Sequence, residues 1–416
     1  MYRNDAIIIG AGQAGLAMSH CLSARGIDHV LLERGRVAER WRSERWDSLR
    51  LLTPNWMSRL PGWSYHGPDP DGFMTMPEVA RFLADYAKAS AAPVIGGTTV
   101  KAVAQESGGY RVDTNRGTFR ARCVVIATGN CDTPVVPAFA RHLAPDIHQV
   151  TPSAYRRPDD LSTGGVLVVG AAASGVQLAE EIHASGRPVS LSVGSHMRLP
   201  RRYRGRDIMW WLDRAGILRQ PVETLPDVTR AKAQPSLQLV GRPDHSALDL
   251  GVLRDKGVRL VGRTIAAEGP VIHLRPDLAD TSAKAQAKLD RLLAQLDRAA
   301  PPDTPQAAPL PPITTDPGPE RLDLRAEGIR SIVWAVGFRR NYDWLRVPVL
   351  DRAGEVVHDG GVTPARGLYV LGLRLLRHRS SNFIDGVGAD AQALAAHLHA
   401  TLLGERSWSM ETALMS

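Results

Sequence analysis

The chain has 416 residues, of which 44% are hydrophobic and 23% charged, and its formal net charge is +8. This length suits two domains rather than one core, and no stretch approaches the roughly 18 to 20 consecutive apolar residues of a membrane span. The basic residues are scattered arginines without a nucleic-acid-binding module, and the N-terminus lacks signal-peptide features, so we expect a cytoplasmic protein that binds neither nucleic acid nor membrane.

The N-terminal segment predicts a strand, a tight turn, a helix and a second strand over residues 5–35. Its first apolar run, AIII at residues 6–9, is typical of a strand buried on both faces of a parallel sheet. The same pattern returns at residues 165–194, 160 residues further on when counted from Gly10 to Gly170. One fold therefore occurs twice in the chain.

Residues 10–15 form a complete GxGxxG motif between the predicted strand and helix, and Glu33 ends the next strand. Gly10 allows the tight turn, Gly12 lets the backbone approach a pyrophosphate, and Gly15 lets helix and strand pack closely. The helix N-terminus offers N–H groups to phosphate, while Glu33 can accept hydrogen bonds from ribose hydroxyls. This context predicts a dinucleotide site.

Residues 170–175 repeat the motif with Ala172 in place of the middle glycine. One methyl group narrows the approach to a pyrophosphate without blocking it, and the Ser174 hydroxyl can donate to a phosphate oxygen. No acid ends the following strand, where Ser195 and Arg198 stand instead. An arginine without a competing carboxylate suits a 2′-phosphate and favours NADPH over NADH. The alternative is a degenerate motif kept only for packing.

Further segments connect and follow the two copies. Residues 100–126 suggest a small β-meander that ends in a core strand, and the proline-rich residues 299–320 are expected to form a linker. Beyond the linker, residues 331–337 and 367–372 suggest two more buried strands, and a helix is expected from about Gly388 to Leu403. The N-terminal domain is therefore expected to resume after the linker.

Several motifs resemble the flavin-containing monooxygenase superfamily, the class B flavoprotein monooxygenases, and especially its bacterial members and the plant auxin-forming flavin monooxygenases. The tryptophan-rich residues 39–63 are similar to a family segment that lines the flavin. Residues 127–129 match the ATG motif that links the two dinucleotide domains, and residues 335–338 are similar to its second copy. Residues 367–391 are similar to the closing strand and helix that cover the flavin. The resemblance implies FAD at the first glycine motif and NADPH at the second.

Motifs and resemblance together imply an α/β fold with two Rossmann-like dinucleotide-binding domains, the FAD domain being discontinuous in sequence. The predicted boundaries are 1–160 for the first part of the FAD domain, 161–320 for the NADPH domain with its linker, and 321–416 for the return to the FAD domain. No catalytic residue is assigned and no metal is expected. The expected FAD-binding residues are Gly10, Gly12, Gln13, Ala14, Gly15, Glu33, Arg34, Trp41, Trp46, Thr53, Val100, Ala127, Thr128 and Gly129. The expected NADPH-binding residues are Gly170, Ala173, Ser174, Gly175, Ser195, Arg198 and Gly337.

The chain also departs from the family pattern. Phe139, His148 and Tyr155 match the fingerprint FxGxxxHxxxY in order but not in spacing. Baeyer–Villiger relatives carry a tryptophan where Tyr155 and Arg156 stand, which disfavours ketone insertion. Leu52 occupies the position at which mammalian-type members place an asparagine near flavin C4a.

The function implied by the resemblance is that of an FAD-dependent NADPH monooxygenase. Through a C4a-(hydro)peroxyflavin it would transfer one atom of O2 to the nitrogen or sulfur of a small organic substrate, or act at a carbonyl. The alternatives are an NAD(P)H-dependent flavin oxidoreductase that passes electrons to a quinone or protein, and a non-enzymatic redox sensor. Cys21, Cys123 and Cys131 form no CxxC pair, which argues against a disulfide reductase. A homodimer is compatible with the sequence.

Overall fold

The first glycine motif lies at the centre of a seven-stranded sheet. A computed structural model describes residues 4–414 and the side chains of residues 4–404. The sheet has the order β5-β2-β1-β8-β7-β6, and β23 pairs in parallel with the last part of β8. The hairpin β6–β7 pairs antiparallel with the first part of β8 and forms the predicted meander. The strands are β1 (Asn4–Ile9), β2 (His29–Leu32), β5 (Val94–Ile95), β6 (Val100–Glu106), β7 (Gly109–Thr114), β8 (Gly117–Ile126) and β23 (Leu368–Val370).

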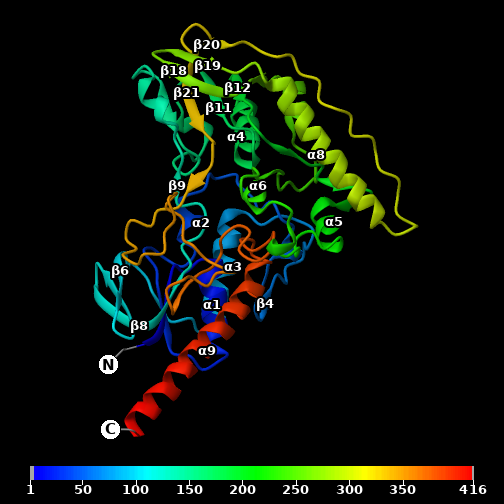
Figure 1. Cartoon of the computed structure of the whole chain (residues 1–416). Helices are drawn as coiled ribbons and strands as arrows, with labels where there is room; N and C mark the ends of the chain where they lie inside the picture. The colour runs from blue at the N-terminus through cyan, green and yellow to red at the C-terminus, as the bar shows by residue number, and fades with distance from the viewer. Residues whose placement is uncertain (1–3, 415–416) are drawn as a thin grey trace.

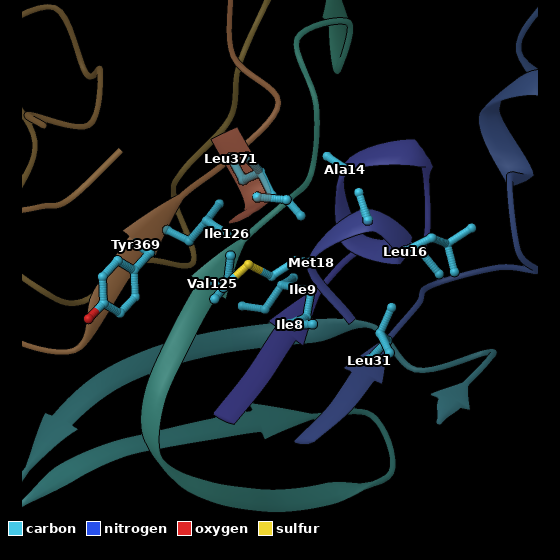
Figure 2. Packing of buried hydrophobic residues seen from close by; sticks show 14 of the residues in the cluster. Ile8, Ile9, Ala14, Leu16, Met18, Leu31, Val125, Ile126, Tyr369 and Leu371 are labelled. Atoms are coloured by element: carbon cyan, nitrogen blue, oxygen red, sulfur yellow. The ribbon is translucent and has the colours of Figure 1, made fainter. Parts of the chain in front are cut away.

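The core of this first domain forms because β1 and β8 are apolar on both faces. Figure 2 shows Ile8 of β1 and Val125 of β8 packed with Met18 of α1, and all three side chains are fully buried. Helices α3 and α9 pack against α1 on the same side of the sheet (Figure 1). The helices are α1 (Gln13–Ser23), α3 (Met76–Ala89) and α9 (Val387–Leu414). The C-terminal helix thus begins where it was predicted and is longer than predicted.

The second glycine motif lies in a five-stranded parallel sheet with the order β10-β21-β11-β12-β17. Helices α4 and α7 pack against this sheet, and a small antiparallel sheet, β18-β19-β20, extends one end of the domain (Figure 1). The strands are β10 (His148–Val150), β11 (Gly165–Val169), β12 (Val189–Ser192), β17 (Arg259–Val261), β18 (Thr264–Glu268), β19 (Val271–Leu274), β20 (Arg321–Asp323) and β21 (Ile329–Trp334). The helices are α4 (Ala173–Ala184) and α7 (Leu250–Asp255).

The proline-rich segment follows α8 (Leu278–Arg298), the longest helix of the second domain. Residues 301–319 contain no helix or strand and run back along the outer side of α8 to β20 (Figure 1). The predicted linker is therefore a strap that stays within one domain, rather than a connection between two domains.

The chain crosses between the domains twice, and the two crossings are paired with each other. β9 (Thr133–Pro134) carries the chain out of the first domain, and β22 (Phe338–Arg339) carries it back. They form a two-stranded antiparallel ribbon in which Arg339 pairs with Thr133 and Phe338 with Pro134.

The predicted fold class is confirmed, but three strands lie in the domain that was not expected. β10 falls within 1–160 and β21 within 321–416, yet both pair in the second, five-stranded sheet, and β20, also within 321–416, pairs with β19 of the second domain. The physical reason is that an apolar strand pattern does not reveal which sheet the strand joins. The second domain therefore extends from β9 to β22, and β23 returns to the first sheet.

Shorter elements surround the junction of the two domains. They are α2 (Glu39–Ser43), α5 (Ile208–Arg214), α6 (Val228–Lys232), β3 (Arg59–Leu60), β4 (Trp63–Ser64), β13 (Met197–Arg198), β14 (Arg202–Tyr203), β15 (Arg206–Asp207) and β16 (Leu237–Gln238). Among the residues that the structure describes, no helix has the length and apolar character needed to cross a membrane.

Candidate functional site

A single cavity of about 2350 Å³ is lined by residues of both domains. Gly10 and Gly12 of the first glycine motif and Gly170 and Ser174 of the second all line it. Pockets for one small ligand occupy roughly 300–1,000 Å³, so this cavity has room for more than one extended ligand.

The first turn has the geometry that the GxGxxG pattern predicts. Gly10 has a φ of +105°, and a Cβ there would lie 2.7 Å from the carbonyl oxygen of Ala127. A Cβ at Gly15 would lie 1.9 Å from the carbonyl oxygen of Gly10, so only glycine lets α1 pack this closely on the turn. A Cβ at Gly12 would meet nothing within 4 Å, because that position faces the cavity. The turn therefore fits a pyrophosphate at the N-terminus of α1.

Glu33 at the end of β2 is held in a fixed position at the cavity wall. Its Oε2 accepts a hydrogen bond of 2.8 Å from the Ala11 N–H, and its Oε1 accepts one of 2.9 Å from the Gly35 N–H. The side chain is buried but still lines the cavity. Each carboxylate oxygen keeps acceptor capacity, which suits the hydroxyls of a ribose.

The second turn has nearly the same backbone geometry as the first. Gly170 has a φ of +107°, and a Cβ there would lie 2.4 Å from the carbonyl oxygen of Ala335. A Cβ at Gly175 would lie 1.7 Å from the carbonyl oxygen of Gly170. Ala172 has φ −82° and ψ −170°, close to the −85° and −171° of Gly12. Because Ala172 keeps this backbone conformation, the second turn also fits a pyrophosphate.

Most of the predicted site residues line this one cavity. They are Gly10, Gly12, Gln13, Ala14, Glu33, Arg34, Trp41, Thr53, Val100, Ala127, Thr128, Gly129, Gly170, Ser174, Ser195 and Gly337. Gly15 and Gly175 lie behind the two turns, where they allow helix and strand to pack, and Ala173 is buried at the start of α4.

Trp46 lies elsewhere. Its side chain is only 4% exposed and belongs to the core of the second domain, with Tyr155 and Val176. Trp41 does line the cavity, where the Arg45 guanidinium lies 5.5 Å from its ring centroid. The tryptophan-rich segment thus places one predicted side chain in the cavity and uses the other to anchor the segment to the second domain.

Arg198 is also directed away from the cavity. Its Nε donates to Asp249 Oδ2 at 2.8 Å, and its Nη1 donates to Gln286 Oε1 at 2.6 Å and to the Pro311 carbonyl at 2.7 Å. The guanidinium is therefore buried against a carboxylate, and this geometry contradicts the expected contact with a 2′-phosphate. No local pattern indicates this pairing, because Asp249 lies 51 residues further along the chain.

Arg263, which the sequence did not indicate, lies beside Ser195 at the cavity wall. It lies in the loop between β17 and β18, and its Nη2 donates to Ser195 Oγ at 3.2 Å. The nearest carboxylate, on Asp277, is 3.9 Å away. Lys288 and Arg291 of α8 line the same cavity.

Another part of the cavity wall is apolar, and we call it the apolar chamber. Its residues also pack in one hydrophobic cluster: Leu52, Met209, Leu212, Ile217, Leu218 and Phe383. The chamber adjoins the first glycine motif, because Gln13 Nε2 donates to the carbonyl of Asn382 at 3.4 Å. Leu52, which was expected at the family asparagine position, contributes an apolar side chain here.

Comparisons with known proteins agree with this geometry. A family model described as pyridine nucleotide-disulphide oxidoreductase matches residues 7–206. An uncharacterized CzcO-like oxidoreductase of Geobacillus kaustophilus is 34% identical over 393 residues, which is 94% of this chain and 97% of the relative. Indole-3-pyruvate monooxygenase YUCCA1 of Oryza sativa is 33% identical over 48% of this chain and 50% of its own length. A flavin-containing monooxygenase from Stenotrophomonas maltophilia has the same fold, with a TM-score of 0.66 and 20% identity over 96% of this chain and 99% of its own.

Fold and cavity together define a flavoprotein oxidoreductase with two dinucleotide-binding domains. The chain belongs to the family of CzcO-like oxidoreductases. The resemblance to flavin-containing monooxygenases is confirmed. These relatives imply FAD and NADPH as the cofactors.

Proposed function

We propose that the protein is an NADPH- and O2-dependent flavoprotein monooxygenase that transfers one oxygen atom to a small organic substrate, at nitrogen, sulfur or a carbonyl. The observation that carries this proposal is the single cavity in which both glycine turns and the apolar chamber meet. The two glycine turns alone would be enough to bind two dinucleotides. The adjoining chamber adds a place for a third, apolar molecule.

The two turns bind and orient the cofactors in this proposal. Gly12 and Glu33 hold FAD, while Ser174, Ser195 and Arg263 hold NADPH. When bound, the cofactor pair supplies hydride transfer and the activation of O2. Arg263 sets the preference for NADPH over NADH, because its guanidinium matches a 2′-phosphate and β12 ends without a competing acid.

The apolar chamber excludes water from the reacting groups. Met209 and Leu212 are almost fully buried beneath its surface, and Leu52 presents no polar group. Excluding water protects a reactive oxygen donor against unproductive decay and strengthens electrostatic interactions in the site.

Disulfide reduction is disfavoured by the positions of the cysteines. Cys21 and Cys123 are buried, and burial raises the pKa of Cys21 to about 11. Cys131 lines the cavity, but the chain has no further cysteine to pair with it. A thiol–disulfide relay needs an accessible thiolate with a partner sulfur. The alternatives are a flavin reductase that passes electrons to a quinone or a protein, and a non-enzymatic redox sensor.

Rapid mixing separates the monooxygenase from the reductase. The FAD-loaded protein is reduced anaerobically with NADPH and then mixed with O2 while absorbance is followed. A monooxygenase is expected to give an absorbing species that is neither reduced nor oxidised flavin and that lasts for seconds. Direct, single-step return to oxidised flavin, together with fast quinone reduction, would contradict the proposal and favour the reductase.

A further inference from the structure

We propose that the substrate is an organic acid whose carboxylate is held by Arg379 and whose apolar body fills the apolar chamber. This inference rests on the proposed function, and it names the class of substrate that the same cavity takes. Arg379 is the residue that carries the argument, and neither the sequence motifs nor the comparisons assign it a role.

The Arg379 guanidinium is partly buried in the cavity wall and has free donors. Its Nε donates to Gln220 Oε1 at 3.2 Å, and Gln220 also lines the cavity. Among the described residues, neither terminal nitrogen of Arg379 has a hydrogen-bond partner. Arg379 lines the cavity and is only partly buried, so its two unused terminal donors are available to a ligand that supplies acceptors.

Arg379 also lacks a counter-ion. The nearby acid Asp385 is already paired with Arg59, whose Nε and Nη2 lie 2.5 and 3.0 Å from its two oxygens. In the described part of the chain, no carboxylate lies within 4.0 Å of Arg379. Burial lowers the pKa of Arg379, as expected for a cation that no acid stabilises. A carboxylate matches the guanidinium fork with two parallel hydrogen bonds and would provide the missing charge.

The surroundings of Arg379 set the position of the ligand. The backbone N–H of the adjacent Ser380 donates to the carbonyl of Leu218, a chamber residue, at 3.0 Å. Asn382, three positions further on, is tied to Gln13 of the first glycine motif. An acid bound at Arg379 would therefore lie with its apolar body in the chamber, beside the FAD turn. An amine would bring its cation towards an uncompensated guanidinium, which disfavours amine substrates.

Binding to the oxidised, FAD-loaded protein tests this inference. Three probes share one phenylpropyl body: 3-phenylpropanoate, 3-phenylpropanamide and 3-phenylpropylamine. Each is titrated while the flavin absorbance is followed, without NADPH. We expect the carboxylate to bind at least about tenfold more tightly than the amide, because a charge-assisted hydrogen-bond pair is worth more than a neutral one. The amine should bind most weakly.

Two variants and a control sharpen the test. Arg379→Gln removes the charge and should abolish the carboxylate preference, whereas Arg379→Lys keeps a point charge and should keep part of it. Arg352→Gln makes the same change in net charge at an exposed position outside the cavity and should keep the full preference.

Equal binding of the three probes by the native protein would overturn the proposal. So would an unchanged carboxylate preference in Arg379→Gln. These titrations involve no turnover, so their outcome is independent of the rapid-mixing experiment. A failed oxygen-transfer test combined with carboxylate binding at Arg379 would refute the proposed chemistry and leave the acid-binding site in place.

Discussion

Gly12 and Ala172 occupy the same middle position in the two glycine motifs, and a Cβ atom there has a different effect from a Cβ atom at Gly15. Gly12 and Ala172 share a backbone conformation, and a methyl group at either position projects into the cavity. Gly15 is different, because a methyl group there would collide with the turn that it packs against. The middle position therefore controls the approach of a ligand, and the last position controls folding.

Substituting these two glycines should separate binding from stability. Gly15→Ala would force its Cβ to 1.9 Å from a backbone oxygen, and we expect a loss of roughly 2–4 kcal/mol in the free energy of unfolding. Gly12→Ala should leave the unfolding of the cofactor-free protein almost unchanged and weaken FAD binding about tenfold. Chemical denaturation and FAD titration measure the two effects. Equal destabilisation by both changes would contradict this assignment.

Local sequence patterns predicted the two turns. They did not predict contacts of side chains that lie far apart in the sequence. Gly10, Gly12 and Gly15 act on their own turn, so their spacing alone carries the information. Arg263 reaches Ser195 from 68 residues away, and no periodicity marks such a contact. Trp46 was predicted to lie near FAD from a family resemblance, but packing against the second domain determines its position.

At the scale of elements, Arg198 joins four segments of the second domain. It lies on β13 and contacts the residue before α7, a residue of α8 and the proline-rich strap. Asp249 also accepts from the N–H of Val252 at 3.0 Å and so caps α7. The long strap is thus held by a hydrogen bond from the buried, ion-paired Arg198 to the Pro311 carbonyl rather than by regular structure, which explains why composition alone suggested only a linker.

Replacing Arg198 should reduce the stability of the protein, whereas replacing Arg263 should weaken NADPH binding. Arg198→Met leaves the Asp249 carboxylate without its partner, so we expect a loss of about 3–5 kcal/mol in stability and faster proteolysis within residues 301–319. Arg263→Gln should leave stability nearly unchanged and weaken NADPH binding about tenfold, with little effect on NADH.

Unfolding curves and nucleotide titrations on both variants provide the measurement, and each variant is the control for the other. A selective loss of NADPH affinity in Arg198→Met, at unchanged stability, would restore the role first expected for Arg198.

At the scale of the whole molecule, buried histidines in both parts of the chain couple stability to pH. Burial lowers the pKa of His29, His196 and His358 below the usual value of about 6.5. His29 has both ring nitrogens engaged, with Ser19 Oγ and the Ile27 carbonyl, each at 2.8 Å. The unfolded chain takes up protons at these positions more readily than the folded protein does, so stability is full above pH 6.5 and falls as the pH decreases.

The free energy of unfolding should therefore be lower at pH 5.5 than at pH 7.5, by up to about 1.4 kcal/mol for each histidine that stays neutral. His29→Gln should reduce this pH dependence, and the exposed His66→Gln serves as its control. Denaturation at both pH values tests the expectation. An identical pH dependence in the two variants would mean that His29 binds its proton as readily in the folded protein as in the unfolded chain.

The paired crossings β9 and β22 have a consequence for protein engineering. Because the second domain enters and leaves through adjacent strands, the two cut points for a graft lie side by side. Residues 135–337 then form a transplantable cassette. A chimera that receives the cassette of an NADH-dependent relative would exchange electron donors while retaining the host flavin site, provided that the graft also preserves the packing surface for Trp46.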